Sequence, residues 1–320
     1  MEPVVSIICN TYNQAGYIRD ALDGFLMQKA DFSFEALIHD DASTDGTADI
    51  IREYADRYPD VIKPFYQTEN KYSKGVNINM VYQFPRVRGK YIAFCEGDDY
   101  WTDPLKLQKQ VDAMESHSDV DICAACTAET QNERPCGKCA PADFDTVFTA
   151  EQVILGGGGF VATCSLMIRS EIFEHIPEFR KILQIDYTTQ IMGALRGGML
   201  YLADCMSVYR RFSKGSWSAA YYYNREMQIS LNNKMKSMLL KLDEETEGKY
   251  SGAIQYKLKE NEFYLLNNNG DYGAMLSSEY KEIYNNLHWK GKLKLRLRRC
   301  FPWLVSLHRK RHKKNFDKER

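Results

Sequence analysis

The chain has little of what marks secreted or membrane-spanning proteins. Its longest apolar runs fall far short of the ~20 residues needed to cross a bilayer. The first residues, Met1-Glu2-Pro3, carry neither a basic segment nor a long apolar segment, which argues against a secretion signal. Nine cysteines, an odd number scattered through strand-like runs, favour reduced thiols over a disulfide framework. We therefore expect a cytoplasmic protein.

The composition is that of an ordinary globular protein, with 44% hydrophobic and 27% charged residues. A length of 320 residues suffices for one large α/β domain with an appendage, or for two modest domains. The net charge of −1 hides an asymmetry, because residues 290–320 contain 13 Lys and Arg against two Asp and Glu. The rest of the chain is therefore acidic.

The basic end is interleaved with apolar residues such as Leu293, Leu297 and Trp303. One interpretation is a solvated basic helix or a disordered tail. Another is a segment that lies on an anionic membrane, with cations on the lipid headgroups and apolar side chains at the interface. Nucleic-acid binding is the weakest alternative, because no nucleic-acid module is recognisable. We expect contact with the inner face of the cell membrane and no nucleic-acid partner.

Strand and helix patterns alternate over the first 130 residues, which predicts a mostly parallel, Rossmann-like α/β sheet flanked by helices. The expected strands are 4–9, 34–39, 62–66, 91–95 and 120–125. The expected helices are 17–26, one that follows the capping residues 43–45 and runs to about 58, 76–84 and about 105–116. Helical patterns dominate from 221 to 284. The predicted organisation is an α/β domain at 1–215, a helical extension at 216–289 and a basic amphipathic tail at 290–320.

Polar clusters follow three of the expected strands: Thr11-Tyr12-Asn13, Asp40-Asp41 and Glu96-Gly97-Asp98-Asp99. In parallel sheets, ligands bind at the carboxyl ends of the strands, so these clusters should meet at one edge. Carboxylates crowded at the end of a buried strand repel one another and need a cation, supplied by a metal or by Lys and Arg. The pattern predicts a site for a polyphosphate and a metal.

Four stretches resemble family 2 glycosyltransferases with the GT-A fold: 5–13, 40–47, 89–99 and 208–211. The segment 98–108 is especially similar to bacterial members that build surface polysaccharides. The resemblance implies a metal-dependent, inverting hexosyltransferase. Its donor would be a nucleotide sugar, usually linked to UDP. Its acceptor would be a hydroxyl of a glycan or of a lipid-linked molecule.

The resemblance also implies roles for residues of the donor site. Thr11, Tyr12 and Asn13 would line the base and ribose, and Asp40 would hydrogen-bond the base. Lys74 could offset phosphate charge, although an exposed lysine is the commoner state.

The metal position is implied by the same resemblance. Asp98 would lie by the ribose or the metal, and Asp99 would ligate Mn²⁺ or Mg²⁺. Glu96 replaces the first Asp of the family's D-x-D motif, a mild departure because a longer carboxylate can still reach. Phe212 stands where many members have a metal-ligating His, and Arg210 or Arg211 could contact phosphates or form simple salt bridges.

Asp186 is the best match to the family's catalytic base, which takes a proton from the acceptor hydroxyl. The match is partial, because the preceding residue is often acidic in the family and here is Ile185. A helix N-cap is the alternative role for Asp186. No covalent intermediate is required.

Two cysteine pairs, Cys123-x-x-Cys126 and Cys136-x-x-Cys139, have spacing compatible with structural zinc. The alternative is that Cys123 is a buried strand thiol, a common state for cysteine.

Two other functions were weighed. A sugar-nucleotide nucleotidyltransferase should show a glycine-rich phosphate loop after the first strand, where this chain has Asn10-Thr-Tyr-Asn-Gln-Ala-Gly16. An inactive scaffold module on a membrane complex is disfavoured by the presence of Asp40, Asp98, Asp99 and a candidate base.

Overall fold

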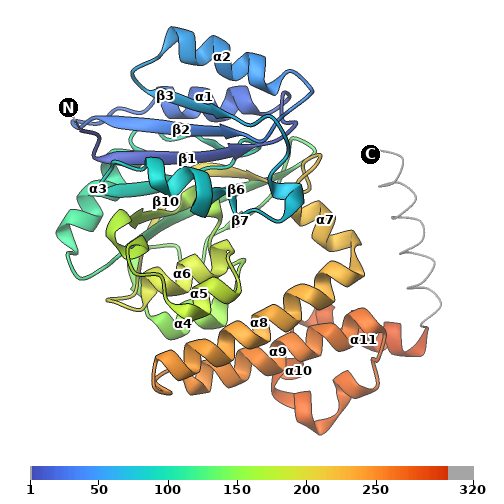
Figure 1. Ribbon diagram of the computed structural model, residues 1–320. Coiled ribbons are helices and arrows are strands. Elements are labelled where there is room, and N and C mark those ends of the chain that lie inside the picture. Colours follow the sequence, from blue (N-terminus) through green and yellow to red (C-terminus); the bar gives the residue numbers. More distant parts are fainter. Residues whose placement is uncertain (1, 302–320) are drawn as a thin grey trace. The chain divides into compact units, whose positions relative to one another are not determined.

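The computed structural model describes residues 2–301. The chain divides into two compact units, Met1–Ala219 and Ala220–Arg320 (Figure 1). Of the expected basic tail, residues 302–320 lie outside the described residues.

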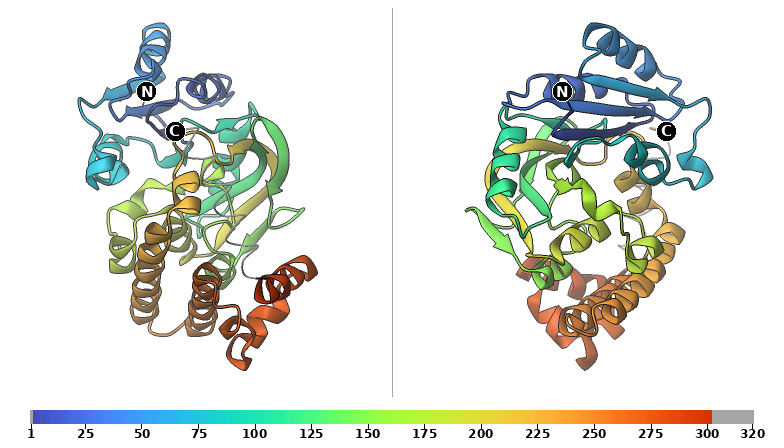
Figure 2. Two further views of the ribbon diagram at one scale, coloured as in Figure 1. Left: turned by 90° about the vertical axis from the view of Figure 1, so that its right-hand side faces the viewer. Right: turned by 60° about the vertical axis from the view of Figure 1, so that its left-hand side comes forward.

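The first unit is built on one mixed sheet of ten strands. Its first half consists of four parallel strands in the order β3-β2-β1-β4: β1 (Val5–Thr11), β2 (Phe34–Asp40), β3 (Ile62–Tyr66) and β4 (Tyr91–Phe94). Figure 2 shows how this sheet curves from its N-terminal strands toward the strands that follow in the sequence.

The second half of the sheet is joined to the first by β9 (Met167–Arg169), which runs antiparallel to both β4 and β6 (Ile122–Gln131). Strand β10 (Met199–Arg210) pairs in parallel with β6. Three short strands complete the sheet: β5 (Tyr100–Trp101) and β8 (Thr146–Phe148) pair with β10, and β7 (Arg134–Cys139) pairs with β6. The sheet therefore contains more antiparallel pairs than the alternation of strands and helices in the sequence indicated.

Helices cover the sheet through apolar stripes. In α1 (Ile18–Leu26), Ile18, Ala21, Leu22 and Phe25 recur at helical spacing and are fully buried. The ring of Phe25 meets the edge of Trp101 with centroids 5.0 Å apart. The remaining helices of this unit are α2 (Thr47–Arg57), α3 (Lys106–Ser116), α4 (Ala150–Gly156), α5 (Glu178–Ile182) and α6 (Asp186–Ala194).

Helix α6 packs closely on β6 through a glycine. A Cβ atom at Gly193 would lie 2.7 Å from the Cβ of Ile122, so only glycine allows this approach. The close contact at Gly193 therefore packs the C-terminal part of α6, whose first residue is Asp186, directly against β6.

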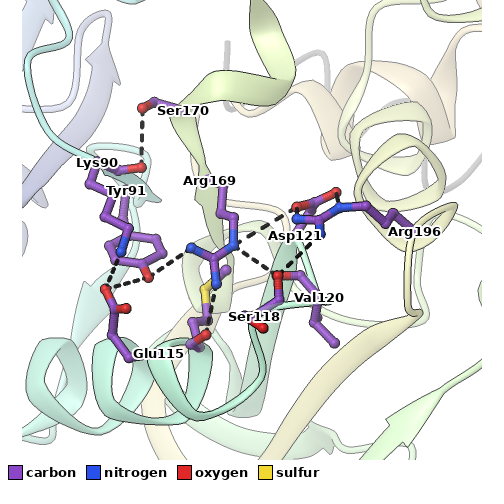
Figure 3. A network of polar contacts seen from close by, with 10 residues as sticks. Lys90, Tyr91, Glu115, Ser118, Val120, Asp121, Arg169, Ser170 and Arg196 are labelled. Carbon is purple, nitrogen blue, oxygen red and sulfur yellow. Dashed lines mark hydrogen bonds and ion pairs between the residues drawn. The ribbon is translucent and has the colours of Figure 1, made fainter.

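A buried arginine, Arg169 on β9, ties three elements together (Figure 3). Its Nε donates to the carbonyl of Val120 (3.0 Å), one Nη to the hydroxyl of Tyr91 (3.1 Å) and the other to the carbonyl of Met114 (2.7 Å). Asp121 lies 3.8 Å from Nε and supplies the opposite charge. Every guanidinium nitrogen thus has a partner, as burial of a charge requires.

The helix expected over 76–84 is present in a shifted and irregular form. The chain forms a π-helical turn at Asn79–Gln83, followed by a 3₁₀ turn at Phe84–Arg86. The buried Gln83 side chain explains the irregularity, because it donates to the carbonyls of Cys9 (3.2 Å) and Leu37 (3.0 Å). One inserted side chain thus bridges β1 and β2, and π turns of this kind are frequent near functional sites.

The second unit is helical. Its helices are α8 (Arg225–Glu245), α9 (Ser251–Asn269), α10 (Lys281–Asn286) and α11 (Trp289–Cys300), and α7 (Trp217–Tyr223) spans the boundary. A small core joins α9, α10 and α11 and is formed by Phe263, Tyr272, Met275, Tyr280, Ile283 and Leu295. Within the described range, no helix combines the length and the apolarity that a bilayer crossing requires.

Candidate active site

The structure brings the three predicted polar clusters together at the carboxyl ends of β1, β2 and β4. Thr11, the last residue of β1, is in register with Asp40, the last residue of β2. The amide of Gly97 donates to the carbonyl of Asn10 (2.9 Å), which places the acidic turn beside the end of β1. The parallel strands fix this convergence, because their polar C-terminal residues must lie on one edge.

The nucleoside side of this edge has polar atoms without protein partners. One carboxylate oxygen of Asp40 accepts from the amide of Ser43 (3.2 Å), while the other is buried and accepts no bond within residues 2–301. The buried hydroxyl of Thr11 is also unpartnered within that range. Burial raises the pKa of Asp40. Buried polar atoms normally find partners, so these two are suited to a ligand.

The other predicted nucleoside residues lie at the surface of the same edge. Tyr12 is exposed, and Asn13 has a positive φ of 53°. The side chain of Asn13 accepts from the amide of Thr44 (2.8 Å), and its own amide donates to Ser43 (2.8 Å). These bonds fasten the turn after β1 to the turn after β2.

Lys74 lies apart from the carboxylates of this edge. It is exposed and forms an ion pair with Glu69, which also pairs with Lys71. Asp41 holds the same loop by accepting from the amides of Lys71 (2.8 Å) and Tyr72 (2.9 Å). Lys74 is thus paired with Glu69 in the structure. The predicted contact of Lys74 with phosphate stays a prediction.

The acidic turn is tightly packed around Gly97. A Cβ atom there would lie 2.6 Å from the side-chain oxygen of Gln14 and 2.8 Å from the Cβ of Thr11. Asp98 accepts from the hydroxyl of Ser213, and one oxygen of Asp99 accepts from the amide of Arg210 (2.8 Å). The turn is therefore fixed by residues more than one hundred positions later in the chain.

The guanidinium of Arg210 forms its ion pairs elsewhere, although its charge acts to lower the pKa of Asp98. It donates to the backbone carbonyl of Asp98 (3.0 Å) and forms ion pairs with Asp20 and with Glu133 (3.0 Å). Of the two roles open to Arg210 from the sequence, salt bridging is the one seen here.

The surroundings of the acidic turn disfavour the charged forms of its three carboxylates. Burial, together with the charge of Asp98, raises the pKa of Glu96 to about 8. Burial likewise raises the pKa of Asp98 and of Asp99. In the part of the chain that the structure describes, no Lys, Arg or His forms an ion pair with any of the three. A cation at this turn would stabilise the charged forms.

The donor set fits a divalent cation that is shared with a substrate. The described residues contain no group of three or more His, Cys, Asp or Glu placed to hold a metal on their own. Mg²⁺ is, however, commonly held by one or two carboxylates together with substrate phosphates. Asp98 and Asp99 are the carboxylates here that would serve in this way.

Asp186 is the first residue of α6, and its charge acts on Glu96 of the acidic turn by helping to raise the pKa of that carboxyl. One carboxylate oxygen accepts from the hydroxyl of Thr163 (2.9 Å) and the other from the amide of Tyr187 (2.7 Å). Burial raises the pKa of Asp186. The residue in the N-cap position is Ile185, so Asp186 lies one residue inside the helix.

Tyr209 on β10 belongs to the site and was not anticipated. Burial raises the pKa of its hydroxyl, and the charges of Asp99, Asp98 and Asp186 act in the same direction. A single phenol is thus close to both acidic groups. Ser213 and Thr163 were missed as well, since nothing local marks a strand tyrosine or a lone hydroxyl as part of a site.

The predicted zinc site does not form. Cys123 and Cys126 lie three residues apart on β6, where side chains alternate between faces, and Cys123 contacts Gln110 inside the core. Cys136 is exposed, and Cys139 donates to the carbonyls of Gly159 and Phe160. All four cysteines are described, and they form no metal-binding group. This cofactor prediction is wrong.

Comparison with known proteins identifies the family to which this α/β domain belongs. The model of "Glycosyl transferase family 2" matches residues 6–214, and the chain belongs to this family. An uncharacterized protein of Mycobacterium tuberculosis is 35% identical over 237 residues, which cover 73% of this chain and 66% of that protein. The match thus spans about two thirds of that relative. Bacillus subtilis TuaG, named a putative teichuronic acid biosynthesis glycosyltransferase, is 28% identical over 68% of this chain and 85% of its own length.

Solved structures confirm the predicted fold class. S. aureus TarS 1–349 in complex with UDP-GlcNAc superposes with a TM-score of 0.60 at 16% identity, covering 91% of this chain and 78% of the TarS 1–349 chain. The mannosyltransferase PcManGT of Pyrobaculum calidifontis, in complex with GDP-Man and Mn²⁺, gives a TM-score of 0.51 at 15% identity over 87% and 77% of the chains. The protein therefore has the GT-A glycosyltransferase fold with additional C-terminal helices.

Proposed function

We propose that this protein is an inverting, metal-dependent glycosyltransferase that moves a hexose from a UDP-linked donor to an acceptor hydroxyl. The observation that carries the proposal is the pairing of two acidic groups. The acidic turn Glu96–Asp99 lies at the strand ends, and Asp186, at the start of α6, acts electrostatically on Glu96 of that turn. The acidic turn could hold the cation of a donor diphosphate, and the carboxylate of Asp186 could take the proton of an acceptor hydroxyl. Transfer of a sugar requires both functions close together.

In the proposed reaction, Asp186 takes the proton of the acceptor hydroxyl as that oxygen attacks the anomeric carbon. The bond to the nucleoside diphosphate breaks in the same step, so the configuration inverts without a covalent intermediate. General-base catalysis of this type contributes 10²–10⁴-fold. When bound, Mn²⁺ or Mg²⁺ would supply positive charge for the departing diphosphate. Thr163 keeps the base oriented through its hydrogen bond of 2.9 Å.

UDP is the proposed nucleotide. The buried, unpartnered oxygen of Asp40 can accept a hydrogen bond from the N–H of a uracil ring. Thr11 offers its unpartnered hydroxyl beside it. The complex of TarS with UDP-GlcNAc supports this choice, whereas the GDP-Man complex of PcManGT shows that the fold also accepts guanine.

For the acceptor, we propose a glycan or lipid-linked hydroxyl in polysaccharide biosynthesis. The name of TuaG, which refers to teichuronic acid biosynthesis, supports this class. An inactive scaffold is the alternative, and it predicts neither nucleotide binding nor turnover.

Thermal unfolding with nucleotide sugars tests the donor proposal. A UDP-sugar at 100 times its Kd, with Mn²⁺ present, stabilises the folded state by about 2.7 kcal/mol, which raises Tm by about 5 °C. GDP-mannose at the same concentration is expected to give a smaller shift. The matched control is Asp40→Asn, which replaces the free carboxylate and should remove most of the preference for UDP. No shift with any UDP-sugar would contradict the proposed donor and favour the scaffold.

We further propose that α11 contacts an anionic membrane surface. Trp289, Leu293, Leu297 and Phe301 follow one another at i, i+4 spacing and are between 45% and 62% exposed. They line a shallow hollow of about 360 Å³ together with Lys290, Lys294 and Arg298. An exposed apolar stripe between cations suits anionic lipid, where each Lys or Arg contributes about 1 kcal/mol.

Vesicle sedimentation tests this contact. The double variant Leu293→Glu/Leu297→Glu is expected to bind phosphatidylglycerol vesicles at least 10-fold more weakly than the unmodified protein, because it places two anions in the apolar stripe. The control is Leu240→Glu, which alters an exposed leucine on α8. If the double variant sediments like the unmodified protein, α11 is only a solvated helix.

A further inference from the structure

Arg180 on α5 is a buried cation without a buried anion. Its side chain is 5% exposed, yet Nε and one Nη have no hydrogen-bond partner in the described part of the chain. Arg169 gives the contrast within the same domain, since it is 7% exposed and all its nitrogens are partnered (Figure 3). A desolvated guanidinium with free N–H groups is costly and needs a reason.

Asp186 is the charged group that acts on Arg180, but it does not neutralise it. The hydrogen bonds found for the oxygens of Asp186 come from the hydroxyl of Thr163 and the amide of Tyr187, and not from Arg180. Within residues 2–301, no ion pair joins Arg180 to any acid. Burial lowers the pKa of Arg180 to about 10, so the group stays charged at neutral pH. The guanidinium is thus an available cation next to the proposed base.

Arg180 lies on α5, which packs against α6, the helix that begins with Asp186. Asp186 interacts with Glu96 of the acidic turn, where the donor diphosphate would lie. Arg180 interacts with Asp186 and with none of the carboxylates of that turn. Gln190, one turn along α6 from Asp186, also leaves its buried side-chain oxygen without a partner in the described chain. Unsatisfied polar atoms of α5 and α6 are therefore found on both elements that carry or adjoin Asp186.

We propose that Arg180 binds an anionic group of the acceptor, a carboxylate or a phosphate, next to the hydroxyl that Asp186 deprotonates. This inference rests on the proposed function. The planar fork of a guanidinium suits both oxyanions, since it can donate two parallel hydrogen bonds. When a neutral molecule binds such a site, the buried donor stays without a partner, and the site therefore selects strongly against neutral molecules. The enzyme would therefore use acidic rather than neutral acceptors.

Titration calorimetry on the full chain, saturated with UDP and Mn²⁺, tests the proposal. The probes are methyl glucuronide for the carboxylate source and glycerol 1-phosphate for the phosphate source, with methyl glucoside and glycerol as neutral counterparts. One of the two anions is expected to bind at least 10-fold more tightly than its neutral counterpart. Arg180→Gln should remove this preference, and Arg180→Lys should restore part of it.

Stability and nucleotide binding separate this role from a structural one. Arg180→Gln removes no hydrogen bond from Nε or that Nη, so its Tm should equal or exceed that of the unmodified protein. Arg169→Gln breaks the network of Figure 3 and should lower Tm by several degrees. The affinity of Arg180→Gln for UDP should be unchanged.

Three results would overturn the proposal. They are equal binding of anionic and neutral probes, a preference that survives in Arg180→Gln, or a loss of Tm in Arg180→Gln as large as in Arg169→Gln. Failure of the unmodified protein to bind UDP would instead contradict the proposed function. The anion preference can then still be measured without nucleotide.

Discussion

Asp99→Asn is expected to lower metal-dependent hydrolysis of a UDP-sugar about 10³-fold. The substitution removes a negative charge at the turn where the diphosphate and its cation would be held, and losing one charge-stabilising group typically costs 10²–10³-fold or more. The amide keeps an oxygen that can accept from the amide of Arg210, a bond of 2.8 Å in the structure. The fold should therefore persist. The measurement is the release of UDP without acceptor across a series of Mn²⁺ concentrations.

Stability gives this experiment an internal check. Asp99 is buried and its pKa is raised, so the folded protein disfavours its charge. The neutral Asn should leave Tm unchanged or raise it, whereas activity falls. The matched control is Asp103→Asn, which removes a carboxylate paired with Lys109 (2.8 Å) outside the site and should leave hydrolysis unaffected. Undiminished hydrolysis in Asp99→Asn would exclude this carboxylate from metal and diphosphate binding.

Asp186→Asn is expected to slow transfer to an acceptor 10²–10⁴-fold, the usual contribution of a general base. Its geometry should survive, since Asn can accept from the amide of Tyr187 and donate to the hydroxyl of Thr163. Binding of UDP and the associated rise in Tm should not change. The measurement is the rate of product formation, compared with the rate of UDP release without acceptor.

The two proposed roles of Asp186 differ in what this variant alters. A residue that only supports the start of α6 would, when changed, alter Tm slightly and leave transfer intact. Thr163→Val provides a graded control, because it removes the hydroxyl that orients Asp186 and should slow transfer less than Asp186→Asn. Transfer at the unmodified rate in Asp186→Asn would show that another group is the base.

The strand ends of the site could be predicted from the sequence because their positions follow from local patterns. A run of apolar residues marks each of β1, β2 and β4, and parallel strands must place their C-terminal residues on one edge. The polar residues that follow those runs therefore had to converge. No knowledge of side-chain contacts was needed for this step.

The residues that the sequence analysis missed are held by long-range packing. Tyr209 lies on β10 and Ser213 in the turn after it, and the proposed acceptor-binding Arg180 lies on α5. The positions of these residues depend on how the second half of the sheet joins the first through β9. That junction is antiparallel and short, so strand-helix alternation does not reveal it. An unpaired arginine can be recognised only when its neighbours are known.

The errors have equally local causes. The segment 76–84 has apolar spacing typical of an α-helix, but the buried bonds of Gln83 to two strands enforce a π turn. The zinc prediction failed because a C-x-x-C spacing places both thiols together in a turn, whereas on an extended strand it points them to opposite faces.

Arg210 has a mechanical consequence for the whole site. Its backbone amide holds Asp99, its guanidinium holds the carbonyl of Asp98, and the same guanidinium is anchored by Asp20 and Glu133. The last residue of β10 therefore links the first half of the sheet to the second through hydrogen bonds and ion pairs. We therefore expect the acidic turn to have its present geometry before any substrate binds, because the bonds that hold it come from the protein itself.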